Sequence, residues 1–153
     1  MKETVLNIIK GSLDFDSELR GYEVGYPDDG DPFVWLDYFS TKVGRLRVGV
    51  TIETEQISLF IIPERFNNEE SDIWDNQIMY SILNRANIHL GYDYKMIAPD
   101  HLLGNKTFSV RHTSISFGEV LMNKHVIPGA IRKLIWYTEY GIGKMENALR
   151  GKY

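Results

Sequence analysis

Residues 45–61 read RLRVGVTIETEQISLFI, and this stretch decides the fold. Apolar side chains recur at every second position, at Leu46, Val48, Val50 and Ile52 and again at Ile57, Leu59 and Ile61. Polar residues fill most of the intervening positions, which is typical of strands with one buried and one exposed face. Glu55 and Gln56 interrupt the alternation, so the stretch predicts two antiparallel strands joined by a short turn.

Further strands are predicted on both sides of this pair. Residues 33–40 are rich in aromatic and branched side chains and add a third strand to the meander. The other short segments with strand character are 22–26, 94–99, 107–112 and 115–117. Gly104-Asn105 marks a turn between two of them. Short links favour antiparallel pairing, so we expect an antiparallel sheet of about five strands.

Three segments have the periodicity of amphipathic helices, namely residues 2–13, 71–90 and 127–149. Ser71 is expected to cap the second helix at its N-terminus and Gly91 at its C-terminus. The elements then follow the order α-βββ-α-ββ-α, in which runs of strands are separated by single helices. That order predicts one α+β domain over residues 1–153, with three helices flanking the sheet.

The composition narrows the functional classes. The chain has 153 residues and no cysteine, which excludes disulfides, thiol catalysis and cysteine–zinc sites. A net charge of −4 argues against a chain that binds nucleic acid over its whole surface. Residues 1–13 lack the apolar core of a signal peptide, and no stretch has the ~20 apolar residues of a membrane span. We therefore expect a cytoplasmic protein that binds neither nucleic acid nor membrane.

Residues that could carry chemistry are scattered along the chain. The candidates are the histidines His89, His101, His112 and His125, the acidic turn Asp28, Asp29 and Asp31, and the carboxylates Glu53 and Glu55. The histidines form no close ligand pair, and the acidic turn lacks the alternate ligand spacing of an EF-hand loop. Phosphate-binding and nucleophile-elbow motifs are missing, and the glycines near Lys144 fall within a helical pattern. We expect no catalytic residues, no metal and no cofactor.

The terminal helix carries the most informative pattern. One continuous stripe follows its core face, at Ile127, Ile131, Leu134, Ile135, Thr138, Ile142, Met145 and Leu149. Trp136 and Tyr140 fall on the opposite side, and Tyr137 also lies off the stripe. Arg132, Lys133 and Lys144 flank these aromatic residues as a polar rim would. Either a covering loop or another protein chain would remove the aromatic side chains from water.

Several short motifs resemble the YbjN family, whose fold is similar to that of type III secretion chaperones. The helix ending at residues 83–87 (LNRAN) resembles the family's L-N-x-x-N helix end. Residues 92–96 (YDYKM), the strand 108–112 (FSVRH) and the closing helix follow in the family's order, and the meander at 33–62 resembles its first sheet half. The acidic, proline-flanked segment 27–32 has no counterpart. The resemblance implies a compact domain that binds proteins, often as a homodimer, without a cofactor.

Three functional hypotheses follow from these observations. The first is a non-enzymatic protein-binding module, an adaptor or chaperone-like domain, with Trp136, Tyr137, Tyr140, Arg132 and Lys144 as its partner-binding residues. The second is an immunity or antitoxin-type inhibitor, because the acidic face of a small domain can occlude a basic active site. The third is a small enzyme that uses dispersed acidic and histidine residues.

Overall fold

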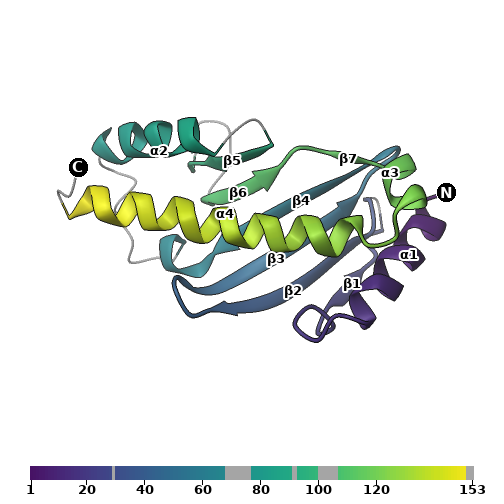
Figure 1. Ribbon diagram of the computed structural model, residues 1–153. Helices are drawn as coiled ribbons and strands as arrows, with labels where there is room; N and C mark the ends of the chain where they lie inside the picture. Colours follow the sequence, from purple (N-terminus) through teal and green to yellow (C-terminus); the bar gives the residue numbers. More distant parts are fainter. Residues whose placement is uncertain (29, 68–76, 91–92, 100–106, 151–153) are drawn as a thin grey trace.

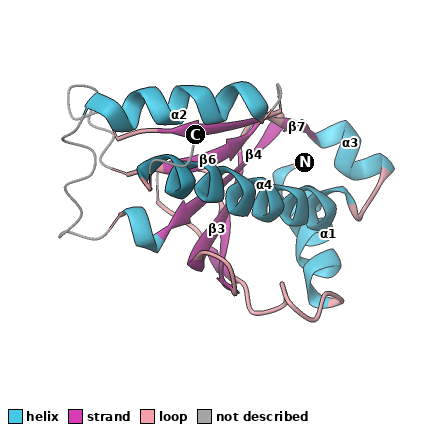
Figure 2. Ribbon diagram, turned by 60° about the vertical axis from the view of Figure 1, so that its left-hand side comes forward, coloured by secondary structure: helices cyan, strands magenta, loops and turns pink. Residues whose placement is uncertain are grey.

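The chain folds into two layers, a twisted antiparallel sheet and a layer of helices over one of its faces (Figure 1). The computed structural model describes residues 1–28, 30–67, 77–90, 93–99 and 107–150. The longest helix runs across the sheet, and the N-terminal helix lies near the beginning of that helix (Figures 1 and 2). The α+β class expected from the alternation at residues 45–61 is confirmed.

In the described parts of the chain, seven strands form the sheet. They are β1 (Glu23–Gly25), β2 (Phe33–Ser40), β3 (Gly44–Ile52), β4 (Gln56–Pro63), β5 (Tyr94–Ile97), β6 (Ser109–His112) and β7 (Ile115–Ser116). The strand order is β1-β2-β3-β4-β6-β5, with β7 paired to β4 beyond β6, and all pairs are antiparallel. The sheet has more strands than the five or so expected from the sequence, because the shortest segments, β1 and β7, also pair in it.

The helices are α1 (Lys2–Asp14), α2 (Gln77–His89), α3 (Phe117–Met122) and α4 (Val126–Leu149), with a short 3-10 turn, η1, at Glu64–Phe66. Three of them correspond to predicted helices. The fourth, α3, was not expected, although Ser116 and Glu119 have the spacing of a capping box and the Ser116 hydroxyl accepts a hydrogen bond from the Glu119 N–H. The expected caps Ser71 and Gly91 and the turn Gly104-Asn105 lie outside the described residues.

The core lies between the helices and one face of the sheet. The inward-facing side chains of β3 and β4 are all buried, as are the apolar residues Val5, Leu6, Ile9 and Leu13 of α1. The stripe of α4 is confirmed from Ile127 to Met145, but Leu149 is wrongly included. Ala148 is buried in its place and Leu149 is 49% exposed, because the last turn of α4 directs position 148 toward the core.

Two asparagine side chains stand in for backbone partners at strands. The Met96 N–H donates to Asn87 Oδ1 at 2.7 Å, and Asn87 Nδ2 donates to the Met96 carbonyl at 2.9 Å. Asn67 bonds both backbone groups of Phe108 in the same way, at 2.7 and 3.0 Å. Because β5 ends the strand order, Asn87 satisfies polar groups that an edge strand leaves unpaired. The L-N-x-x-N motif therefore contributes a structural clamp.

Replacing Asn87 with alanine tests this clamp. We expect Asn87→Ala to lower the free energy of unfolding by about 1–3 kcal/mol, because the buried Met96 backbone loses both hydrogen bonds. Urea unfolding followed by circular dichroism measures the change. Asn84→Ala is the matched control, since Asn84 is exposed on the same helix and gains the same helix propensity. Equal effects of the two substitutions would contradict the clamp.

Candidate interaction surfaces

Side chains of α4 and β5 form a continuous ladder of aromatic rings, in the order Tyr94, Tyr137, Trp136 and Tyr140. Lys144 lies at its end, and we call these five residues the aromatic ladder. The rings of Tyr94 and Tyr137 stack with centroids 4.1 Å apart. Tyr137 meets Trp136 edge to face at 4.9 Å, and Trp136 stacks on Tyr140 at 5.5 Å with only 6° between the ring planes. Lys144 Nζ lies 5.4 Å from the Tyr140 ring centroid. Each ring is therefore held by at least one neighbouring ring.

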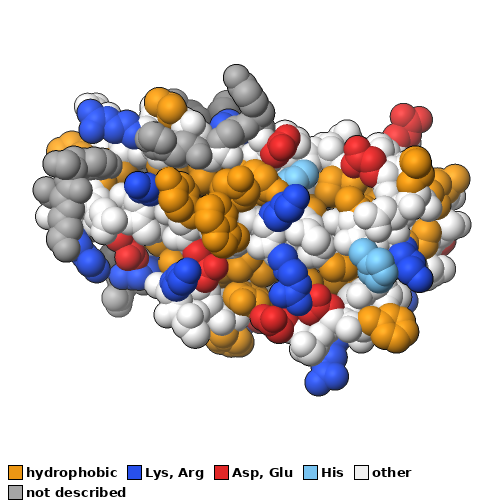
Figure 3. All heavy atoms as spheres, viewed as in Figure 1, with side chains coloured by type: hydrophobic (Ala, Val, Ile, Leu, Met, Phe, Trp, Pro, Cys, Tyr) orange, Lys and Arg blue, Asp and Glu red, His pale blue; other side chains and the backbone are white. Residues whose placement is uncertain are grey.

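The ladder leads from the core to the surface. Tyr94 is buried, and burial raises the pKa of its hydroxyl, which keeps that end neutral. Tyr137 and Tyr140 are partly buried against the core, whereas Trp136 is 54% exposed. Figure 3 shows hydrophobic side chains gathered over the middle of α4. Trp136 thus faces away from the core as expected, whereas Tyr140, which was expected to do the same, is partly buried against the core. Tyr137 is packed within the chain by its stacking on Tyr94.

The middle of α4 packs closely on the sheet. Gly141 lies against Met96 of β5, and a Cβ at this position would come within 2.7 Å of the Met96 sulfur. The approach explains a glycine in the middle of a helix, a residue that weakens helices elsewhere. Gly141 therefore has a packing role, and the glycines preceding Lys144 are part of α4 and not of a loop.

Arg132 has a different role from the one its position suggested. Its guanidinium bonds both carboxylate oxygens of Asp16 at 2.6 Å and reaches Glu18 at 3.3 Å. It therefore ties α4 to the segment after α1 instead of forming part of a rim around the ladder. Burial raises the pKa of Asp16, but the hydrogen bonds from Arg132 and from the Glu18 N–H outweigh it, so the pKa lies below its usual value.

This ion pair predicts a pH dependence of stability. Because folding lowers the pKa of Asp16, its contribution is present above the unfolded pKa of about 4 and is lost as pH falls through the folded value. Arg132→Met should lower the free energy of unfolding by about 1 kcal/mol at neutral pH. The difference from the wild type should vanish in acid. Lys133→Met, an exposed neighbour on α4, is the control, and a difference that persists unchanged at low pH would contradict the assignment.

The second face of the sheet is covered by no other described element. Its outward-facing side chains include Phe33, Trp35, Phe60 and Ile62, which surround a shallow hollow of about 440 Å³. The Phe60 ring lies over Gly49, where a Cβ would come within 2.2 Å of it. The guanidinium carbon of Arg47 lies 4.5 Å from the Trp35 ring centroid, and that of Arg111 lies 5.7 Å from the Phe60 centroid. We call this surface the open face.

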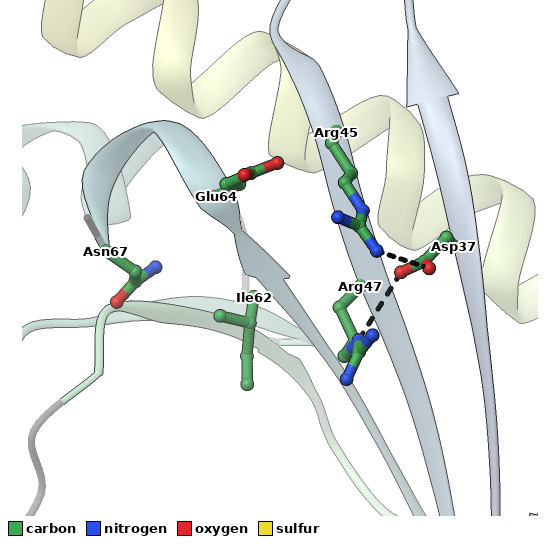
Figure 4. Close-up of a pocket in the computed structure, with 6 residues that line it drawn as sticks. All are labelled: Asp37, Arg45, Arg47, Ile62, Glu64 and Asn67. Carbon is green, nitrogen blue, oxygen red and sulfur yellow. Dashed lines mark hydrogen bonds and ion pairs between the residues drawn. The ribbon is translucent and has the colours of Figure 1, made fainter.

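Charged residues continue the open face toward the beginning of β3. Asp37 accepts hydrogen bonds from Arg45 at 2.7 Å and from Arg47 at 3.3 Å (Figure 4). In this view α4 passes behind the strands, so these side chains project from the sheet away from the helices. The hydrogen bond from Arg45 lowers the pKa of Asp37, which keeps the carboxylate charged and the cluster compact.

The candidate catalytic residues form two separate groups in the described parts of the chain: Asp31, Glu53 and Glu55 line one hollow, and His112 and His125 line another beside Asp93 and Glu119. Glu53 accepts hydrogen bonds from Ser58 and Gln56, and the Ser58 bond lowers its pKa, which opposes a role as a general acid. His112 packs edge to face on Tyr94, and Asp31 pairs with Lys2. No group of three or more histidine or acidic residues in the described ranges has a metal-binding arrangement. Asp29 and His101 lie outside those ranges, as does the His89 side chain.

Comparisons of the chain with protein-family models, curated proteins and solved structures found no match. The resemblance to the YbjN family therefore stays a prediction. None of the described helices is long and apolar enough to cross a membrane.

Proposed function

We propose that this domain is a non-enzymatic protein-binding module, adaptor or chaperone-like, that contacts its partner through the aromatic ladder. The observation that carries the proposal is the exposed indole of Trp136, stacked on Tyr140 and supported from below by Tyr137. Tryptophan and tyrosine are the residues most enriched where binding energy concentrates in interfaces. The YbjN-like motifs point to the same class of function.

The ladder is suited to binding because its rings are already ordered. Trp136 contacts one ring face to face and another edge to face, so little rotational freedom remains to be lost on association. Burying the exposed part of such a side chain contributes roughly 1.5–3 kcal/mol. Lys144 beside Tyr140 adds a charge at the border of the apolar patch, where it can select the orientation of a partner.

The double substitution Trp136→Ser plus Tyr140→Ser tests the proposal. Affinity capture from a native lysate with quantitative mass spectrometry should show at least a tenfold loss of the specific partners of the wild-type chain, because about 2 kcal/mol or more of contact energy is removed. The free energy of unfolding, measured in parallel by urea titration, should fall by less than the global stability, so that the variant remains folded.

Leu149→Ser provides the matched control on the same helix. Leu149 is 49% exposed but contacts no ring of the ladder, so its replacement should leave the captured partners unchanged. If the double variant keeps the full set of partners while folded, the ladder is not the binding surface. If it unfolds, the single change Trp136→Ser, at the most exposed ring, decides between the same two outcomes.

A further inference from the structure

Two aromatic rings of the open face lie over glycines of the neighbouring strand. A Cβ on Gly49 of β3 would come within 2.2 Å of the Phe60 ring, and a Cβ on Gly25 of β1 would come within 2.3 Å of the Phe33 ring. In both pairs the nearest ring atoms are those at the tip of the side chain, and the two residues are directly paired across the strands. Each ring therefore extends along the sheet to the next strand, and together the rings form a low platform.

Guanidinium groups extend this platform. Trp35 of β2 is paired with Gly49, and the guanidinium carbon of Arg47 lies 4.5 Å from the centroid of its ring. The guanidinium carbon of Arg111 lies 5.7 Å from the Phe60 centroid. A guanidinium is planar and stacks on rings while its N–H donors stay available at its edges. The open face therefore alternates aromatic rings with planar cations.

Cations gather in the part of the open face that β3, β5 and β6 form. Arg111 is exposed and forms no ion pair with a described residue, and the row continues from it to Lys95 of β5. Arg45 and Arg47 at the beginning of β3 share a single carboxylate, that of Asp37. This part of the surface is therefore suited to an anionic partner.

The other carboxylates of this side lie at its margins. Glu23 is on the short edge strand β1, Glu64 follows the end of β4, and Glu53 follows the end of β3. The net charge of −4, which argued against binding of nucleic acid over the whole surface, belongs to the chain as a whole. A local surface with cations beside its rings is compatible with that total.

From this arrangement we infer that the open face binds single-stranded RNA. Unpaired bases stack on aromatic rings and on guanidinium planes, and a cationic surface beside the rings holds the phosphates. Trp35 and Phe60 supply the stacking surfaces, and Arg111 lies beside them for a phosphate. The bases of a duplex are stacked on one another and cannot reach the rings, so a duplex could use only the cations.

The hollow of the open face also favours RNA over DNA. Thr51 lines this hollow, and its hydroxyl forms no hydrogen bond with another described residue. A ribose 2′-hydroxyl both donates and accepts hydrogen bonds, and it is the group by which proteins distinguish RNA from DNA. An RNA strand here and a protein partner on the aromatic ladder would occupy opposite sides of the sheet, so neither site depends on the other.

Fluorescence anisotropy with an end-labelled RNA of about 12 nucleotides, built from A, C and U so that it stays unpaired, tests this inference. At low salt the wild-type chain should bind it with a Kd on the order of 10 μM, and added salt should weaken the binding steadily. Arg111→Glu should raise the Kd about tenfold or more, because it removes a phosphate contact and adds a repulsive charge. Trp35→Ala should raise it about tenfold through the loss of one stacked base.

Matched controls separate a site from general attraction by charge. Lys133→Glu makes the same change in net charge on an exposed residue of α4, on the helical side of the sheet, and should change the Kd by no more than about twofold. DNA of the same sequence should bind at least about threefold more weakly than the RNA, and duplex RNA at least about tenfold more weakly. Circular dichroism establishes that each variant is folded, and Arg111→Glu, at an exposed position, decides the matter if Trp35→Ala unfolds.

The inference is overturned if the RNA does not bind at protein concentrations up to about 500 μM, or if Arg111→Glu binds as the wild-type chain does. Equal losses with Arg111→Glu and Lys133→Glu, or equal binding of the duplex, would also overturn it, since neither result requires stacking on the open face. Equal binding of DNA would overturn the choice of RNA. The Trp136→Ser plus Tyr140→Ser variant should bind RNA normally, so a failure of this inference is distinguishable from a failure of the ladder as a protein-binding surface.

Discussion

The pairing of β3 with β4 runs over seven residue pairs, and every layer of the molecule is built on it. All its inward positions carry buried branched or aliphatic side chains, from Leu46 to Ile52 and from Ile57 to Pro63. A slip of one residue would turn this apolar set outward and place Arg45 and Arg47 beneath α4, so the register is strongly fixed. With the register fixed, α1 and α4 have a single apolar face on which to pack.

The same alternation determines what is left outside. The apolar side chains of the central strands point toward the helices that cover them. The positions on the other face of these strands can therefore carry a mixture of aromatic rings and charges. Gly49 is the exception, since Phe60 occupies the space of its missing side chain. A glycine in the middle of a central strand weakens the strand unless something packs over it, and the aromatic ring supplies that contact.

Local patterns predicted most of the fold. The strand at 33–40 and the terminal helix were found nearly to the residue, because their periodicity is long and uninterrupted. Helix α3 was missed, although Ser116 and Glu119 carried its signature. The ladder was only half predictable: helical spacing placed Trp136 and Tyr140 together, but the stacking of Tyr137 on Tyr94 depends on how α4 crosses β5. The partners of Arg132 lie more than 100 residues away in the chain, where no local pattern reaches.

The treatment of the sheet edges has a consequence for assembly. At one edge the Asn87 side chain occupies the outward hydrogen-bonding groups of Met96, and at the other edge β1 is only three residues long. Open-ended growth of protein fibres proceeds by adding strands to exposed edges, where a long row of unpaired backbone groups acts as a template. This chain offers little such template at either end. Addition of a further strand is therefore disfavoured at both of these edges of the described sheet.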